Sequence, residues 1–252
     1  MWFSSHMALT APPETQALLL DLQALDTHLQ QLAHREKTLP EHETLTAIIA
    51  ESESVRATLV DARGDLDDSR TELGRVESDV DLVEKRIARD TERLQSSSSV
   101  KDIQGLEHEV ASLRTRLNDL EEIQLAVMER VEVLELTVEA AESQHRDHAA
   151  RLSAAQEAYH AALAALREER AGVLAQRETL SASIPDDLLA LYEKQRERYG
   201  VGASHLRARV SSASGVELTG SDLETVRAAA PDEVVMCPDS NAILVRTGES
   251  GL

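Results

Sequence analysis

Aromatic residues are almost absent from this 252-residue chain. Phe, Trp and Tyr together make up 2% of it, and the single Trp and the single Phe are its second and third residues. Globular cores usually depend on such side chains for large buried areas, so this composition disfavours an ordinary globular core. The chain is instead rich in Ala, Leu, Glu, Arg, Gln and Val, with only 10 Gly and 6 Pro. That bias is typical of long helices that pack along seams.

Cysteine, long apolar runs and positive charge are also scarce. Cys237 is the only cysteine, which excludes an intramolecular disulfide framework. No apolar run approaches the roughly 18 residues needed to span a bilayer, and no secretion signal is visible, so we expect a cytoplasmic protein without a membrane partner. With 46 acidic and 26 basic residues the net charge is -20, which disfavours general binding to nucleic acids and anionic membranes.

The first 13 residues are expected to lie outside the fold, as a disordered N-terminus or a foreign extension. The stretch Ser-Ser-His-Met at 4–7 resembles the remnant of an expression tag, and a natural extension is the alternative. Pro12 and Pro13 keep the residues before them out of a helix.

Residues 14–183 carry apolar side chains at alternating spacings of three and four, the heptad pattern of a coiled coil. Four serines at 96–99 interrupt the pattern; their hydroxyls compete for backbone hydrogen bonds, which predicts a turn near 96–100. The two arms are nearly equal in length, which favours an antiparallel hairpin within one chain. A parallel homodimer of one uninterrupted helix is the alternative. Pro40 predicts a kink or short break in the first arm.

Four polar residues interrupt the apolar seam. Ser69 and Asp90 fall at seam positions, where polar side chains usually fix the register at some cost in stability. His145 and His148 share a helical face and have the spacing of a metal-ligand pair. No cysteine or Glu-x-x-His pattern completes such a site, so the simpler interpretation is a weakened stretch of the seam.

The pattern changes at Pro185, which ends the second arm. Residues 184–202 are predicted to form a short helix with an apolar face that includes Leu188 and Tyr192, followed by a linker through Gly200 and Gly202.

The last segment, 203–252, is predicted to be a small α+β module. Ser221 and Glu224 form a capping-box pattern that predicts a helix over 222–229. Short strands are expected at 208–210, 216–218, 233–236 and 242–246, around turns at 211–215 and 238–241. The fold class is therefore mainly α, with a long antiparallel coiled-coil hairpin followed by this module.

The order of these elements resembles a known family. A coiled-coil hairpin, the segment IPDDLLALYEKQRERYG and the ending CPDSNAILVRTGESGL resemble the bacterial C4-type zinc ribbon domain proteins with N-terminal coiled coils. That family holds zinc with two Cys-x-x-Cys pairs, and the resemblance places the ligand positions at Ser211, Ser214, Cys237 and Ser240. Serine hydroxyls are poor zinc ligands, and adding His205 to Cys237 still leaves the site two donors short.

The resemblance therefore implies a zinc-ribbon-like module that has lost its zinc, and no cofactor is expected. Cys237 is expected to be a small buried residue, because a redox thiol would need a neighbouring cation or a resolving cysteine. We expect packing from the helix that contains LLALY, residues 188–192, and a set of apolar residues to hold the module together in place of the metal: Val216, Leu218, Val234, Val235, Ile243 and Leu244.

The sequence bears on three classes of function. The chain has no phosphate-binding loop, nucleophile elbow or metalloprotease motif, which disfavours an enzyme. Relatives of the resembled family have been linked to RNA and to transcription or secretion factors, so nucleic-acid binding through the terminal module is the alternative. The basic residues that could serve it are few, and no aromatic residue lies beside them to stack a base: Arg207, Arg209, Arg227 and Arg246.

A non-enzymatic adaptor or scaffold is the function that the sequence favours. Long paired helices and a terminal module present surfaces for partner proteins, and the acidic charge favours a basic partner. We expect an elongated monomer, with a homodimer as the alternative.

Overall fold

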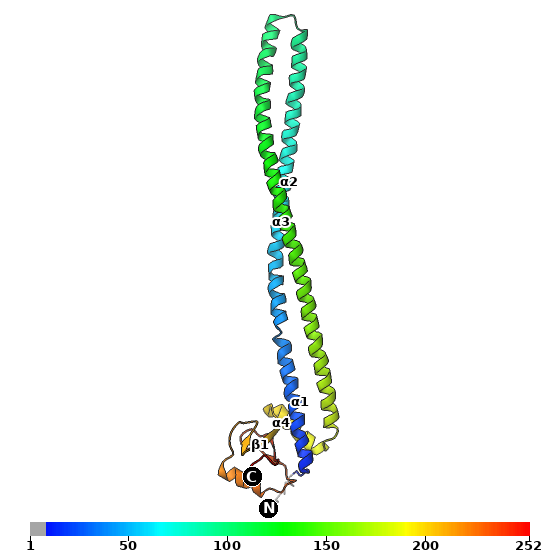
Figure 1. Ribbon diagram of the computed structural model, residues 1–252, viewed down its shortest axis with the longest axis vertical. Coiled ribbons are helices and arrows are strands. Elements are labelled where there is room, and N and C mark those ends of the chain that lie inside the picture. The colour runs from blue at the N-terminus through cyan, green and yellow to red at the C-terminus, as the bar shows by residue number, and fades with distance from the viewer. Residues whose placement is uncertain (1–8) are drawn as a thin grey trace, which may run out of the picture. The chain divides into compact units, whose positions relative to one another are not determined.

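The computed structural model describes residues 9–252, and it confirms the predicted fold class (Figure 1). A long helical hairpin is followed by a short helix and a small mixed sheet. The described residues form five helices and four strands, in the order α1 (Pro13–Lys37), α2 (Pro40–Ser96), α3 (Val100–Ser181), α4 (Asp186–Tyr199), β1 (Ala203–Arg207), β2 (Val210–Ser211), α5 (Gly220–Ala228), β3 (Val235–Met236) and β4 (Ile243–Val245). The chain divides into two compact units, one formed by residues 41–159 and the other by the remaining described residues.

In the first unit, α2 and the first part of α3 pack as an antiparallel pair. Leu59 lies in one buried cluster with Ala141, while Leu66, further along α2, lies in another with Val127 and Val131. Residues later in α2 therefore contact residues earlier in α3, as an antiparallel pair requires. Salt bridges flank the seam, including Arg63 to Glu142 at 2.6 Å, Arg70 to Glu135 at 2.7 Å and Arg151 to Glu51 at 3.3 Å.

The predicted helix breaks are visible in the backbone. The helix α2 ends at Ser96 and α3 begins at Val100, so the serine tract forms the turn. Between α1 and α2, Thr38 closes the first helix with backbone hydrogen bonds to His34 and Arg35, and Pro40 is the first residue of α2. Proline suits that position because the first residues of a helix need no backbone donor.

The polar seam residues are buried, with one exception. Ser69, Asp90 and His148 are each less than 9% exposed. The imidazole Nε2 of His148 lies 3.0 Å from the backbone oxygen of Ile48 across the seam, whereas His145 is exposed. The two histidines therefore do not face a common site.

In the second unit, a four-stranded sheet has the order β2-β1-β4-β3. The central strands β1 and β4 are parallel, with Ala203 opposite Ile243, and the outer strands are antiparallel to them. The helix α1 contacts both central strands.

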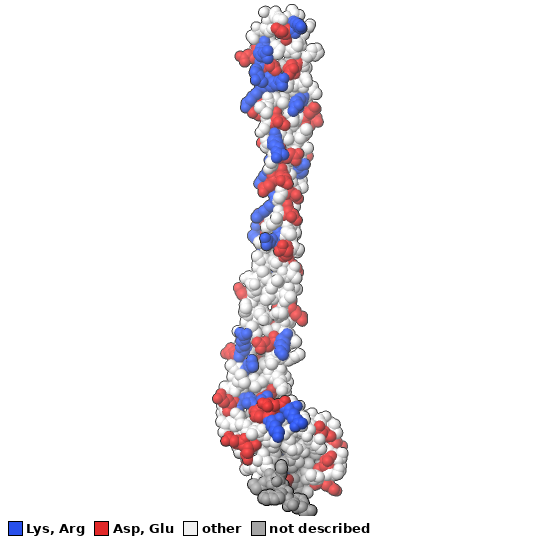
Figure 2. Space-filling view, turned by 180° about the vertical axis from the view of Figure 1, so that it is seen from behind, with Lys and Arg blue, Asp and Glu red and all other residues white. Residues whose placement is uncertain are grey.

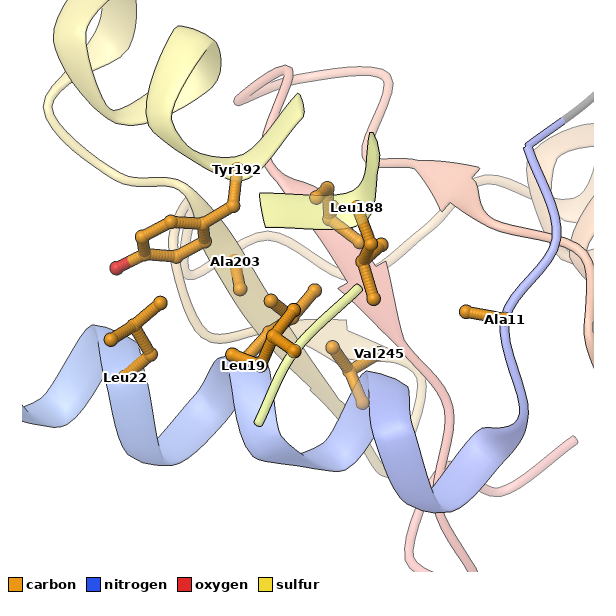
Figure 3. Packing of buried hydrophobic residues seen from close by; sticks show 9 residues of the cluster. Ala11, Leu19, Leu22, Leu188, Tyr192, Ala203 and Val245 are labelled. Carbon is orange, nitrogen blue, oxygen red and sulfur yellow. The ribbon is translucent and has the colours of Figure 1, made fainter. Parts of the chain in front are cut away.

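One core joins α1, α4 and the sheet in this unit. Leu19 and Leu22 of α1 point toward Leu188 and Tyr192 of α4, with Ala203 and Val245 from the sheet (Figure 3). These side chains are at most 2% exposed. The helix predicted within residues 184–202 is α4, and it packs on the sheet as expected. A second cluster beneath α5 contains Leu206, Leu218, Leu223, Val226, Cys237 and Leu244.

Residues 9–13 differ from the expectation that the N-terminus lies outside the fold. The backbone N–H of Ala11 donates to Asp232 at 2.7 Å, and that of Val234 donates to Leu9 at 2.9 Å. Thr10 bridges Glu233 in antiparallel fashion, and Ala11 is 4% exposed. This short segment therefore extends the sheet edge beside β3. The Ser-Ser-His-Met stretch lies outside the described residues.

Two strand predictions in the terminal module are wrong. Of the strand expected at 208–210, only Val210 is in a strand, β2, because Ala208 and Arg209 have φ values of 46° and 70° and form the turn between β1 and β2. The strand expected at 216–218 is reduced to one bridge between Glu217 and Val210.

The predicted helix of this module begins earlier than expected. It starts at Gly220, and Thr219 is its N-cap through a bond from the Asp222 N–H, so the predicted capping role of Ser221 is wrong. Val216, expected in the core, is 52% exposed, whereas Leu218, Ile243 and Leu244 are buried.

Candidate functional site

Three of the four positions that the sequence resemblance suggested as former zinc ligands lie together in the terminal module: Ser211, Cys237 and Ser240. The thiol of Cys237, directly after β3, lies 3.3 Å from the hydroxyl of Ser211 in β2. Ser240 also hydrogen-bonds the Cys237 sulfur. Ser204 in β1 extends the cluster, with its hydroxyl 2.7 Å from that of Ser211. The fourth position, Ser214, accepts a hydrogen bond from the Val216 N–H instead.

The Cys237 thiol is completely buried, and its pKa is lowered. Burial raises this pKa, because desolvation penalises the thiolate. Hydrogen bonds from the hydroxyls of Ser211 and Ser240, and from the backbone at Asp239 and Ser240, stabilise the thiolate and outweigh the effect of burial. The sequence predicted the burial, and the surrounding serines supply the polar contacts.

This donor set does not fit zinc. Structural zinc requires four thiolate or imidazole donors in a tetrahedron, and the cluster offers one thiol among serine hydroxyls. His205 is engaged elsewhere, with its Nε2 2.9 Å from the Thr247 hydroxyl. Within residues 9–252 no group of three or more His, Cys, Asp or Glu side chains is placed to hold a metal.

Three of the four arginines proposed for nucleic-acid contact already have partners within the chain. Arg246 is a structural residue, because its guanidinium donates to five backbone carbonyls around the end of α5, from residues 226, 229, 230, 231 and 233. This corrects its assignment as a ligand contact. Arg207 pairs with Glu249 at 3.1 Å, and Arg209 donates to the Gly251 carbonyl at 3.2 Å. Arg227 remains exposed on α5.

A buried ionic network joins α1, α3 and α4, and sequence analysis did not find it. Asp26 is 3% exposed and accepts from Arg177 Nε at 2.6 Å and from the Tyr192 hydroxyl at 2.7 Å. Arg196 lies 3.4 Å from the same carboxylate, and Glu193 contacts both arginines. The sequence holds one sign of this network: Asp26 lies four positions after Leu22, on the same apolar face of its helix.

The pKa shifts in this network favour its present charge state. The hydrogen bond to Asp26 raises the pKa of Arg177, with Glu193 adding to the effect. Burial and the hydrogen bond to Asp26 raise the pKa of Tyr192, so the phenol stays neutral. Arg177 therefore stays charged and the Tyr192 phenol stays neutral near neutral pH, and both hold their helices against α1 through Asp26.

Four large apolar side chains lie exposed on one side of α3, away from the hairpin seam. They are Leu125, Met128, Val133 and Leu136, which are 61%, 42%, 63% and 67% exposed. At 100° per residue they fall within an arc of about 140°, opposite the buried seam residues Val127 and Val131. We call these four residues the outer face of α3. Hydrophobic side chains gathered in this way mark interaction surfaces, unlike single exposed ones.

Glutamates surround the outer face of α3. Residues 121–142 contain seven acidic residues and a single basic residue, Arg130. In the described part of the chain, five of these acids have no ion-pair partner and share the arc of the outer face: Glu121, Glu122, Glu129, Glu132 and Glu139. The surface is therefore both apolar and negatively charged. Among the described helices, none is long and apolar enough to cross a membrane.

Curated relatives are bacterial proteins of similar length. An uncharacterised protein of Mycobacterium tuberculosis, Rv2229c, is 36% identical over 232 residues, which cover 92% of this chain and 95% of the relative. An uncharacterised protein of Mycobacterium leprae, ML1638, is 29% identical over 224 residues, covering 87% of this chain and 95% of the relative.

Solved structures share the fold. A Mycobacterium smegmatis protein superposes with a TM-score of 0.79 and 34% identity, over 94% of this chain and 100% of the other. CT398 from Chlamydia trachomatis superposes with a TM-score of 0.58 and 18% identity, over 92% and 97%, which shows a common fold. The model of the CT398-like coiled coil hairpin domain matches residues 22–200. The chain therefore belongs to the CT398-like coiled coil hairpin domain family.

Proposed function

We propose that this chain is a non-enzymatic, cytoplasmic scaffold that binds a partner protein through the outer face of α3. The observation that carries the proposal is the gathering of four exposed apolar side chains among unpaired glutamates on one helix face. Apolar area left in water is unfavourable by about 25 cal/mol per Å² relative to burial, so a partner that covers this face gains free energy. The terminal module is the second surface that the scaffold offers.

The partner that fits is a helix with an apolar stripe and basic flanks. An apolar stripe can pack on Leu125, Met128 and Leu136, as amphipathic helices do in grooves and coiled coils. Lys or Arg on either side of that stripe would pair with the free glutamates, which favours encounter and orientation. A second copy of this chain would place acidic faces against each other, so the proposal favours a monomer over a homodimer.

The terminal module is proposed to be a zinc-ribbon-like module that has lost its metal. Convergence of Ser211, Cys237 and Ser240 supports this proposal. The hydrogen bonds of the serine cluster and the apolar cluster beneath α5 would replace the cross-link that a metal provides. Nucleic-acid binding through this module is disfavoured, because three of its four candidate arginines already contact groups of the same chain.

Photo-crosslinking in cells tests the scaffold function. A benzoylphenylalanine at Met128 should give covalent adducts with protein, whereas the same group at Thr137, exposed on α3 but outside the arc, should give far fewer. The adducts should survive nuclease treatment and contain a basic, helical region at the crosslinked site. Adducts that nuclease removes would support a nucleic-acid role, and equal yields at both positions would contradict a specific face.

A further inference from the structure

A groove of about 790 Å³ lies at the turn of the hairpin, between the end of α2 and the start of α3. Its charged lining residues are four basic ones, Arg86, Arg89, Arg93 and Lys101, and three acidic ones, Asp90, Asp102 and Glu109. Its volume falls within the range of small-molecule sites. Figure 2 shows basic side chains gathered toward this end of the hairpin.

The charge around the turn is opposite to that of the chain as a whole. Residues 85–101 hold five basic and two acidic residues, although the net charge of the chain is -20. Acidic stretches border this segment on both sides. Residues 77–84 hold four acidic residues and residues 102–109 hold three, with no Lys or Arg in either stretch. The excess of positive charge is therefore confined to a short segment that includes the basic lining residues, while Asp102 and Glu109 of the next stretch also line the groove.

Ion pairs within the groove leave part of this charge uncompensated. Asp90 is 6% exposed and lies 3.8 Å from Arg86 and 3.6 Å from Arg93, and Glu109 also pairs with Arg86. Among the residues that the structure describes, Arg89 and Lys101 have no acidic partner. Both are exposed. Two cations are thus free to bind an anion without first breaking a pair.

The arginines form a row along one helix face. Arg86, Arg89 and Arg93 are spaced by three and four residues, so they advance by about 4.5 Å and about 6 Å along the axis of α2. Guanidinium groups match the oxygen geometry of phosphates and bind them through paired hydrogen bonds. The hydroxyls of Ser96 and Ser97 also line the groove and can donate to phosphate oxygens.

From these observations we propose that the groove at the hairpin turn binds the polyphosphate group of a small ligand. A row of cations suits several linked phosphates better than one. A long polyanion is disfavoured, because a nucleic-acid backbone leaving the groove would meet the acidic stretches on both arms. No Phe, Trp or Tyr lies between 77 and 109, so the recognition that these residues offer is mainly of the phosphates. This site is independent of the outer face of α3.

Isothermal titration calorimetry of the full chain with sodium tripolyphosphate tests the proposal. We expect one saturable site per chain, with affinity that falls as salt is raised. The double variant Arg89→Gln/Lys101→Gln should bind about tenfold more weakly or worse, since it removes two charge-assisted contacts. A matched control, Arg75→Gln/Arg114→Gln, removes two exposed and unpaired arginines outside the groove and should change the affinity less than twofold.

Three outcomes would overturn the proposal. They are an absence of saturable binding, equal weakening in both double variants, and tighter binding of a 20-nucleotide single-stranded RNA than of tripolyphosphate. A parallel titration with adenosine triphosphate separates two sources of the phosphate group. If adenosine triphosphate binds more tightly than tripolyphosphate, the natural ligand is a nucleotide; if it binds more weakly, the natural ligand is a free phosphate chain. In either case Arg89→Gln/Lys101→Gln must weaken the binding of whichever ligand binds more tightly. Circular dichroism melting of each variant shows whether it is folded, and all four substituted residues are exposed.

Discussion

The Tyr192 hydroxyl donates a hydrogen bond of 2.7 Å to the carboxylate of Asp26, across 166 residues of sequence. This bond links α4 to α1 inside the unit that contains the sheet. Arg177 of α3 holds the same carboxylate at 2.6 Å, so three helices share one buried anion. The hairpin base and the terminal module therefore form one folded unit.

Removing the charge of Asp26 should destabilise this unit. In the Asp26→Asn variant, Arg177 loses the anion that offsets its partial burial, and unfolding should become easier by about 3 kcal/mol. Urea denaturation followed by circular dichroism measures the change. Asp21→Asn, an exposed position on the same helix, should change stability by less than about 0.5 kcal/mol. Equal effects of the two substitutions would show that the network contributes nothing specific.

Two glycine-to-alanine substitutions should have opposite effects. At Gly202 an added Cβ would lie 2.4 Å from the ring of Tyr192, whose side chain is fully buried, so Gly202→Ala should destabilise by about 1–3 kcal/mol. At Gly172, within α3, an added Cβ meets nothing within 4 Å, and Gly172→Ala should stabilise by about 0.5–1 kcal/mol. Thermal melting compares the two variants. A stabilised Gly202→Ala variant would contradict the close packing of α4 on β1.

Local patterns were sufficient to predict the hairpin. Leu59, Leu66, Val127 and Val131 all fell at heptad positions, and all are buried in the seam. The serine tract marked the turn because its effect on the backbone is local. Asn241, with a φ of 56°, likewise follows the expected turn chemistry after Cys237.

Long-range pairing explains what the sequence did not predict. The strand β1 has no alternating pattern because both of its faces are covered: Ala203 packs in the core with α1 and α4, and Leu206 packs in the cluster beneath α5. Ala208 and Arg209 adopt left-handed conformations without the Gly or Asn that would indicate them. Asp26 could not be paired with Tyr192 from spacing alone, since their contact depends on how α4 folds back.

The hydroxyl of Ser211 should control the acidity of Cys237. In Ser211→Ala the thiolate loses a hydrogen bond that lowers its pKa, whereas burial still raises it. The pKa of the thiol should therefore rise. The ultraviolet absorbance of the thiolate reports this directly, because Cys237 is the only cysteine. Ser214→Ala should leave the titration unchanged.

The lowered pKa of Cys237 also determines how the stability of the fold changes with pH. A lowered pKa means that the folded state favours the thiolate. This stabilisation is therefore present above the ordinary pKa of a cysteine, and it is lost as the pH falls through the lowered value. Ser211→Ala should reduce stability at high pH more than at neutral pH, and an equal loss at both would contradict the assignment.

Cysteines at the four proposed ligand positions should create a metal site if the module is zinc-ribbon-like, as we propose. The triple variant Ser211→Cys/Ser214→Cys/Ser240→Cys supplies four thiols together with Cys237, and it should bind one zinc ion per chain and melt at a higher temperature when zinc is present. Metal analysis of the purified protein measures the stoichiometry. A triple variant that folds but takes up no zinc would contradict the zinc-ribbon-like origin of the module.

The most direct test of the scaffold function measures capture of the protein that crosslinks at Met128. Leu125→Gln/Leu136→Gln removes two apolar contacts from the outer face of α3, and it should reduce capture at least about tenfold, which corresponds to about 1.4 kcal/mol. The matched variant Ile49→Gln/Val60→Gln, at two exposed positions of α2, should capture the partner as the unaltered chain does. Equal capture by both variants would show that the outer face of α3 does not bind the partner.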